Sequence, residues 1–158
     1  MPMQFATGLS LQRLPDTAAG LPRAALLRDG RQNGCIIDGT LLEAALRWPD
    51  GWTLLIASAD CPFEESLHLS LLDAHDHIVD CAGIGMAYAS GWLRDLNLSP
   101  PDSVRFGFLG DGEWSVRRLH ERGWRMPLFS EPAGVWRRFG WRRWFVIGRH
   151  ESGDIGTD

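Results

Sequence analysis

Hydrophobic and polar residues alternate along three pairs of short segments, and a period of two is the pattern of half-buried strands. The first pair flanks the turn Pro49-Asp50-Gly51, whose residue types favour a reversal of the chain. Residues 41–48 also have a composition that suits a helix, but their alternation favours a strand. The pattern predicts three hairpins, formed by 41–48 with 52–56, 66–72 with 77–83, and 104–108 with 113–119.

The other segments have less regular patterns. Residues 135–149 predict one long strand, or two strands interrupted at Gly140. Residues 86–96 predict a short helix, which Asn97 and the Pro100-Pro101 pair would end. Residues 1–34 are poorly patterned, and we expect residues 151–158 to form a flexible tail.

Turn-forming residues recur about every eight to twelve positions from residue 29 onward, which is typical of many short strands. The 158 residues contain no linker, and a hydrophobic content of 44% is sufficient for one core. We therefore predict a single domain over residues 1–158. Its fold class is mainly β, an antiparallel meander that forms a partly open barrel or sandwich with one or two short helices.

The cysteines and the amino terminus bear on the cellular compartment. Cys35, Cys61 and Cys81 contain no CxxC pair, and their odd number fits a reducing environment better than a disulfide framework. The amino terminus lacks the basic and apolar regions of a signal peptide. No apolar run approaches the roughly 18 residues of a membrane helix. We expect a cytoplasmic protein without membrane association, and no motif predicts a cofactor.

A histidine- and aspartate-rich stretch is the first candidate for chemistry. His68, His75 and His77, with Asp73 and Asp76, have residue types that bind zinc. However, residues 73–76 form the polar tip of the second predicted hairpin, where Asp and His are common because they satisfy turn backbone groups. No second segment supplies further ligands. We predict no metal site.

Residues 60–68 suggest two catalytic arrangements. Cys61 with His68 has the residue types of a nucleophile and its base, and Glu64 with Glu65 offers two carboxylates. Adjacent residues of an extended chain point to opposite sides, so the two carboxylates would not converge. A buried, inert cysteine is the more common case. We predict no catalytic residue and favour a protein that is not an enzyme.

The distribution of charge is strongly uneven. All 16 basic residues are arginine, and the formal net charge is −4. Residues 1–104 carry six arginines against thirteen acids, whereas residues 105–149 carry ten against four. Within the basic part, residues 136–144 interleave aromatic rings with guanidinium groups. These groups could pair with early acids inside the fold, bind an acidic protein, or bind nucleic acid. The acidic overall balance argues against nucleic acid.

The functional expectation is a non-enzymatic binding module that engages a protein partner or another copy of the chain. The alternative is a small-ligand-binding protein or enzyme whose tryptophan-lined pocket uses Glu64, His68 or His77. Aromatic residues and arginine are frequent anchors of protein interfaces. The expected partner-binding residues are Arg137, Arg138, Trp141, Arg142, Arg143 and Trp144.

Overall fold

The computed structural model describes residues 3–16, 20, 22–59, 66–85, 92–98, 102–108, 112–124, 132–137 and 142–150, with only the backbone for 121–124 and 142. Thirteen strands and no helix occur in this part of the chain. They are β1 (Gln4–Phe5), β2 (Leu9–Arg13), β3 (Arg23–Arg28), β4 (Arg31–Asp38), β5 (Leu41–Arg47), β6 (Thr53–Ser58), β7 (Ser66–Leu72), β8 (Ile78–Gly85), β9 (Arg94–Asn97), β10 (Ser103–Gly107), β11 (Glu113–Trp124), β12 (Val135–Arg137) and β13 (Arg142–His150).

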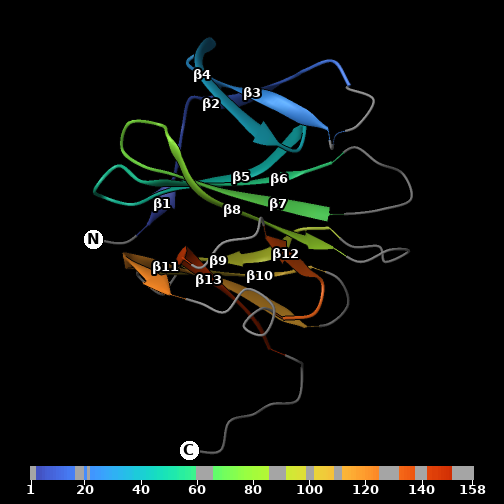
Figure 1. Ribbon diagram of the computed structural model, residues 1–158, viewed down its shortest axis with the longest axis vertical. Helices are drawn as coiled ribbons and strands as arrows, with labels where there is room; N and C mark the ends of the chain where they lie inside the picture. The colour runs from blue at the N-terminus through green and yellow to red at the C-terminus, as the bar shows by residue number, and fades with distance from the viewer. Residues whose placement is uncertain are drawn as a thin grey trace, which may run out of the picture.

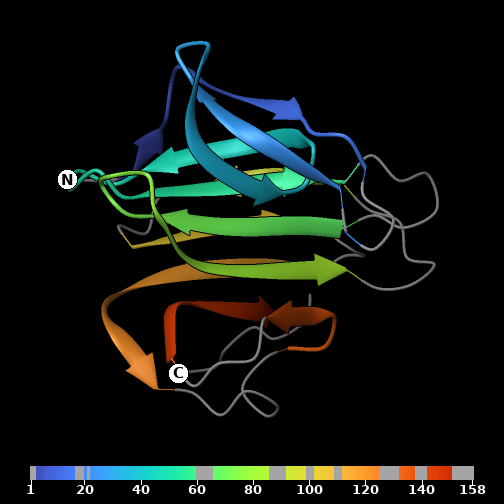
Figure 2. The same cartoon turned by 45° about the horizontal axis from the view of Figure 1, so that its top comes forward.

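The strands form three antiparallel sheets, which lie as layers one above another in Figure 1. The middle sheet has the order β1-β5-β6-β7-β8-β12, and β5 to β8 form a meander. A four-stranded sheet, β13-β11-β10-β9, lies below it, and a three-stranded sheet, β2-β3-β4, lies above it. Figure 2 shows the three-stranded sheet crossing over β5 and β6. The mainly β prediction is confirmed, and none of the described sheets closes into a barrel.

The middle sheet is buried on both faces, and this explains the continuous apolar run of β6. Leu54 and Ile56 pack in a core shared with the four-stranded sheet, together with Phe106, Trp114 and other large side chains. Leu55 of the same strand packs in a second core beneath the three-stranded sheet. The alternation of the strand therefore supplies apolar side chains to two separate cores.

The three predicted hairpins are confirmed. β5 pairs with β6, β7 with β8, and β10 with β11, each in antiparallel register. At the first turn the Trp48 N–H donates to the Trp52 carbonyl at 2.9 Å, and Gly51 has a φ of 92°. Glycine at this position avoids the steric cost of a left-handed backbone conformation.

Two expectations need correction. No described residue of the predicted helix over 86–96 is helical, because Arg94–Asn97 forms β9 and pairs with β10. Residues 86–91 lie outside the described part. The poorly patterned segment 1–34 contains β1 to β3 and the start of β4, so it contributes most of the third layer. Its alternation is interrupted by a register shift between Ala25 and Leu27, which accounts for the weak pattern.

The aromatic and basic segment 135–149 forms two strands, as the second of its two interpretations predicted. β12 is an edge strand of the middle sheet, and β13 belongs to the four-stranded sheet. The segment therefore passes from one layer to the next. Within the described residues no helix is long and apolar enough to span a membrane.

Candidate functional site

The described arginines of the expected partner-binding segment point into the molecule. The Arg137 side chain is 3% exposed, and its Nη1 donates to Asp80 Oδ2 on β8 at 2.9 Å. Its Nη2 donates to the Phe145 carbonyl at 2.7 Å, and the guanidinium lies over the Phe145 ring. Arg143 is also buried. The Arg137 guanidinium therefore joins the middle sheet to the four-stranded sheet.

Trp144 takes part in the same contact between layers. Its backbone N–H donates to Asp80 Oδ2 at 2.8 Å, and its half-buried ring packs against Trp52, with 5.1 Å between ring centroids. Arg138 and Trp141 lie outside the described residues, and of Arg142 only the backbone is described, paired with Trp124. The binding site that we consider below therefore uses other residues.

Arg118 forms a second contact between the layers. Its Nη1 and Nη2 donate to the two oxygens of Asp50, at 2.9 and 2.6 Å. The guanidinium lies 4.4 Å from the ring centroid of Trp52 and 5.2 Å from that of Trp48. The hydrogen bond from Arg118 holds the pKa of Asp50 below its ordinary value. Early acids and late arginines thus pair inside the fold.

A cavity of 340 Å³ lies next to this contact, at the edge of the middle sheet. One wall of the cavity is formed by β1 and the residues that follow it. The other wall is formed by the end of β5 and the start of the turn between β5 and β6. The lining residues are Gln4, Phe5, Ala6, Thr7, Arg47, Trp48 and Pro49. Phe5 is 60% exposed, whereas Trp48 is only 4% exposed. The buried indole Nε1 of Trp48 has no hydrogen-bond acceptor among the described residues.

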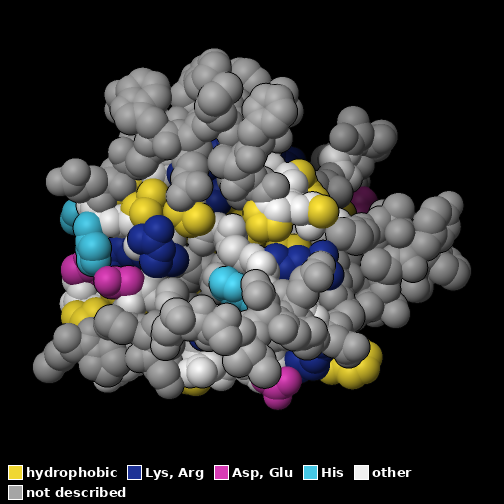
Figure 3. Space-filling view, turned by 90° about the horizontal axis from the view of Figure 1, so that it is seen from below, with side chains coloured by type: hydrophobic (Ala, Val, Ile, Leu, Met, Phe, Trp, Pro, Cys, Tyr) yellow, Lys and Arg dark blue, Asp and Glu magenta, His cyan; other side chains and the backbone are white. Residues whose placement is uncertain are grey.

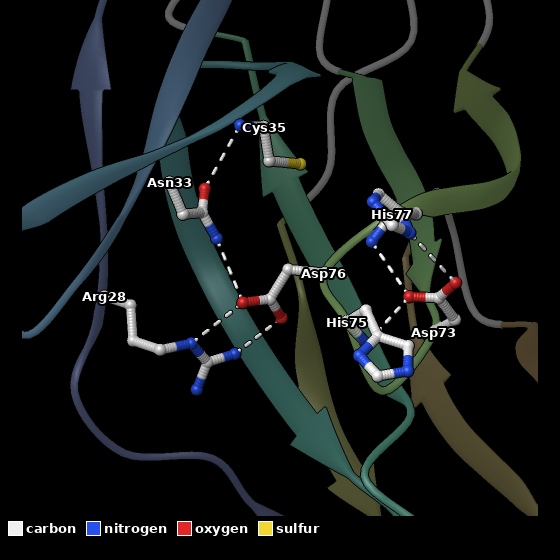
Figure 4. Close-up of polar contacts among 7 residues, drawn as sticks. All are labelled: Arg28, Asn33, Cys35, Asp73, His75, Asp76 and His77. Atoms are coloured by element: carbon white, nitrogen blue, oxygen red, sulfur yellow. Dashed lines mark hydrogen bonds and ion pairs between the residues drawn. The ribbon is translucent and has the colours of Figure 1, made fainter.

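The histidine- and aspartate-rich turn between β7 and β8 makes structural contacts, which Figure 4 shows. Asp73 Oδ1 accepts the backbone N–H groups of His75 and His77, at 2.8 and 3.0 Å. Asp76 accepts two hydrogen bonds from the guanidinium of Arg28 on β3, at 2.7 and 3.0 Å. Both carboxylates therefore have partners, and the described residues contain no group of three or more side chains suited to a metal ion.

The two described histidines of the alternative pocket do not converge. His68 lies near the open end of the β7–β8 hairpin, and His77 lies at its turn. His68 is 3% exposed, its Nε2 lies 3.1 Å from Ser66 Oγ, and its ring meets that of Trp136 edge-on. Burial lowers the pKa of His68. Glu64 and Cys61 lie outside the described residues.

The outer face of the four-stranded sheet carries the exposed arginines of the basic half. Figure 3 views this side of the molecule and shows arginine and apolar side chains interspersed. Arg105 and Arg117 are exposed there, and Arg105 Nη1 lies 3.7 Å from Glu113 Oε1. A polar outer face is ordinary for an antiparallel sheet that covers a core on its other side. We therefore assign no site to this face.

Comparisons with models of protein families, with curated proteins and with solved structures gave no match. The cavity beside β1 is concave and combines an exposed aromatic ring with a cation. The sequence did not indicate it, because Gln4 and Phe5 form only two residues of strand and lie far from Trp48 in the chain.

Proposed function

We propose that this protein is a non-enzymatic binding module that engages a partner protein at the cavity beside β1. The observation that carries the proposal is the exposed Phe5 ring at the rim of a cavity walled by Trp48 and Arg47. Aromatic and arginine side chains around a pocket are the typical anchors of protein interfaces. A side chain of the partner would fill the cavity and cover Phe5.

The rear wall of the cavity is held firmly. Trp48 lies against the guanidinium of Arg118, whose two hydrogen bonds to Asp50 fix its orientation. Asp50 lies in the same turn as Pro49, another wall residue. A wall that is ordered before binding lowers the entropy that association costs. The arrangement therefore suits recognition of a partner.

The lining of the cavity favours binding over catalysis. The described residues that line it include no histidine, cysteine, aspartate or glutamate, and Thr7 supplies the only hydroxyl group among them. General acid–base catalysis needs a group that can exchange a proton near neutral pH. The guanidinium of Arg47 is a group that can hold an anion in place. These residue types support a binding role.

Affinity capture with tagged protein tests the proposal. Phe5→Ser removes the exposed ring at the cavity, and Leu41→Ser is the matched control because Leu41 is an exposed apolar residue of β5 with 51% exposure. We expect a specific partner to be recovered by the wild type and by Leu41→Ser, and to be lost with Phe5→Ser. Equal recovery with both variants would reject this surface.

A second candidate function is the binding of a small ligand. It is favoured by the size of the cavity, because small-molecule pockets span about 300–1,000 Å³ and this one has a volume of 340 Å³. Trp48 supplies the tryptophan of the pocket, although neither His68 nor His77 lines it. Co-purification of a small molecule with the wild type, but not with Phe5→Ser, would favour this candidate.

A further inference from the structure

The cavity beside β1 carries more hydrogen-bond donors than acceptors. Among the described residues, Arg47 is the only ionisable one that lines it, and Gln4 and Thr7 add an amide and a hydroxyl group. Trp48 forms part of the wall, but its indole Nε1 is buried. A ligand that supplies acceptors satisfies such a lining, and a carboxylate is the strongest common partner of a guanidinium.

The acidic residue nearest to Arg47 in the sequence, Asp50, is paired with another arginine. Asp50 follows Pro49, but its two oxygens accept hydrogen bonds from Nη1 and Nη2 of Arg118. Arg118 is the largest cause of the lowered pKa of Asp50, so the carboxylate stays ionised and committed to this pair. The positive charge of Arg47 is therefore available to a ligand at the cavity.

The outer edge of β1 offers backbone groups to the same ligand. β1 is the last strand of the middle sheet, and among the described strands it pairs only with β5. The Ala6 N–H donates to the Ala45 carbonyl at 2.8 Å, and Gln4 is opposite Arg47. Since hydrogen-bonded and non-hydrogen-bonded pairs alternate in an antiparallel ladder, the N–H and C=O of Phe5 point away from β5. They can pair with an added extended segment.

We propose that the occupant of the cavity is an extended, acidic segment of the partner protein, an inference that rests on the function proposed above. The backbone of the segment pairs with Phe5 along the free edge of β1. One of its apolar side chains packs on the Phe5 ring, and one carboxylate binds the guanidinium of Arg47. Charge complementarity selects an acidic segment, and the strand edge requires it to be extended.

A titration monitored by nuclear magnetic resonance tests this proposal on the full-length protein. The probe is the peptide Leu-Glu-Val-Asp-Val-Glu-Leu, capped at both ends. The indole signal of Trp48 is assigned by its loss in Trp48→Phe. We expect the peptide to shift the Trp48 indole signal and the Phe5 amide signal until saturation. The peptide Leu-Lys-Val-Lys-Val-Lys-Leu, which has the same apolar residues, is expected to leave both signals unchanged.

Arg47→Gln is expected to weaken binding of the acidic peptide by about tenfold, because it replaces a charged donor by a neutral one. Arg105→Gln is the matched control on the outer face of the four-stranded sheet, and we expect it to retain the wild-type affinity. Equal weakening by both variants would show general attraction of charges and overturn the proposal. If N-acetylglutamate saturates the site at the same concentrations as the peptide, an extended segment is not required for binding, and this part of the proposal is overturned.

The outcome is separable from that of the proposed function. If Phe5→Ser abolishes capture of the partner but the acidic peptide shifts neither signal, the acidic segment is wrong and the partner-binding function stands. If Phe5→Ser retains capture, the function itself is rejected. Shifts with the lysine peptide equal to those with the acidic peptide would overturn the charge complementarity on which this inference depends.

Discussion

Arg118 on β11 holds the carboxylate of Asp50, which lies 68 positions earlier in the chain, through two hydrogen bonds of 2.9 and 2.6 Å. The pair joins the turn of the first hairpin to the four-stranded sheet. The guanidinium is 95% buried against two tryptophan rings, whereas half of the carboxylate is exposed. The exposed half lowers the cost of desolvating the pair.

Replacement of Asp50 by asparagine should lower the free energy of unfolding by about 1–2 kcal/mol, because the buried guanidinium then lacks an anion. The measurement is urea denaturation at neutral pH. Asp16→Asn is the control, since its ion pair with Arg13 is exposed, and we expect a change within about 0.5 kcal/mol. Equal effects of the two substitutions would show that the Asp50 pair contributes no more than a surface contact.

The same aspartate predicts how stability depends on acid. Because the pKa of Asp50 is lowered in the folded protein, mainly by the hydrogen bond from Arg118, its contribution is present above the unfolded-state pKa. The contribution is lost as the pH falls through the folded-state pKa. Asp50→Asn should therefore flatten the acid limb of the curve of unfolding free energy against pH. An unchanged acid limb would contradict this assignment.

His68 predicts a change of stability at milder pH. Burial lowers its pKa in the folded protein, so the unfolded chain binds a proton more readily. Stability should therefore decrease as the pH falls below the unfolded-state pKa of about 6.5, until the folded-state pKa is passed. His68→Gln should remove this decrease in chemical denaturation between pH 7 and 5. The exposed His120, changed to glutamine, provides the comparison.

Gly83 leaves room for the ring of Trp136, which lies opposite it on β12. A Cβ atom at position 83 would overlap the indole ring. Gly83→Ala should displace Trp136 and lower the free energy of unfolding by about 1–3 kcal/mol. In the background Trp136→Ala the same substitution should cost much less. A double-mutant cycle measures the difference, and additive effects would refute the contact.

Asp76 anchors the three-stranded sheet to the turn between β7 and β8, through Arg28 and Asn33 (Figure 4). Its φ of 62° suits Asp or Asn better than other residues with side chains. Asp76→Ala should speed amide hydrogen exchange in β3 and β4 relative to β7. Asp76→Asn keeps the backbone preference and should speed exchange less than Asp76→Ala. Identical exchange rates in the two variants would show that the backbone preference at position 76 does not contribute.

Much of the candidate site could not be predicted from the sequence. The segment 136–144 attracted notice because rings and guanidinium groups alternate there, but the described Arg137 and Arg143 are buried. The cavity depends on Phe5, whose strand is too short to give a periodic signal. Burial of Arg137 depends on Asp80, which lies 57 positions earlier in the chain, and local patterning contains no information on such a distant contact.

The β class, the three hairpins and the polar turn at Asp73 are predictable from local patterns, because alternation and turn chemistry act between residues close in the chain. The stacking of the sheets as three layers, the contact of Arg118 with Asp50, and the cavity between β1 and Trp48 become visible only in the folded molecule. These contacts join residues distant in the chain. They form only when each sheet buries its apolar face against the next one.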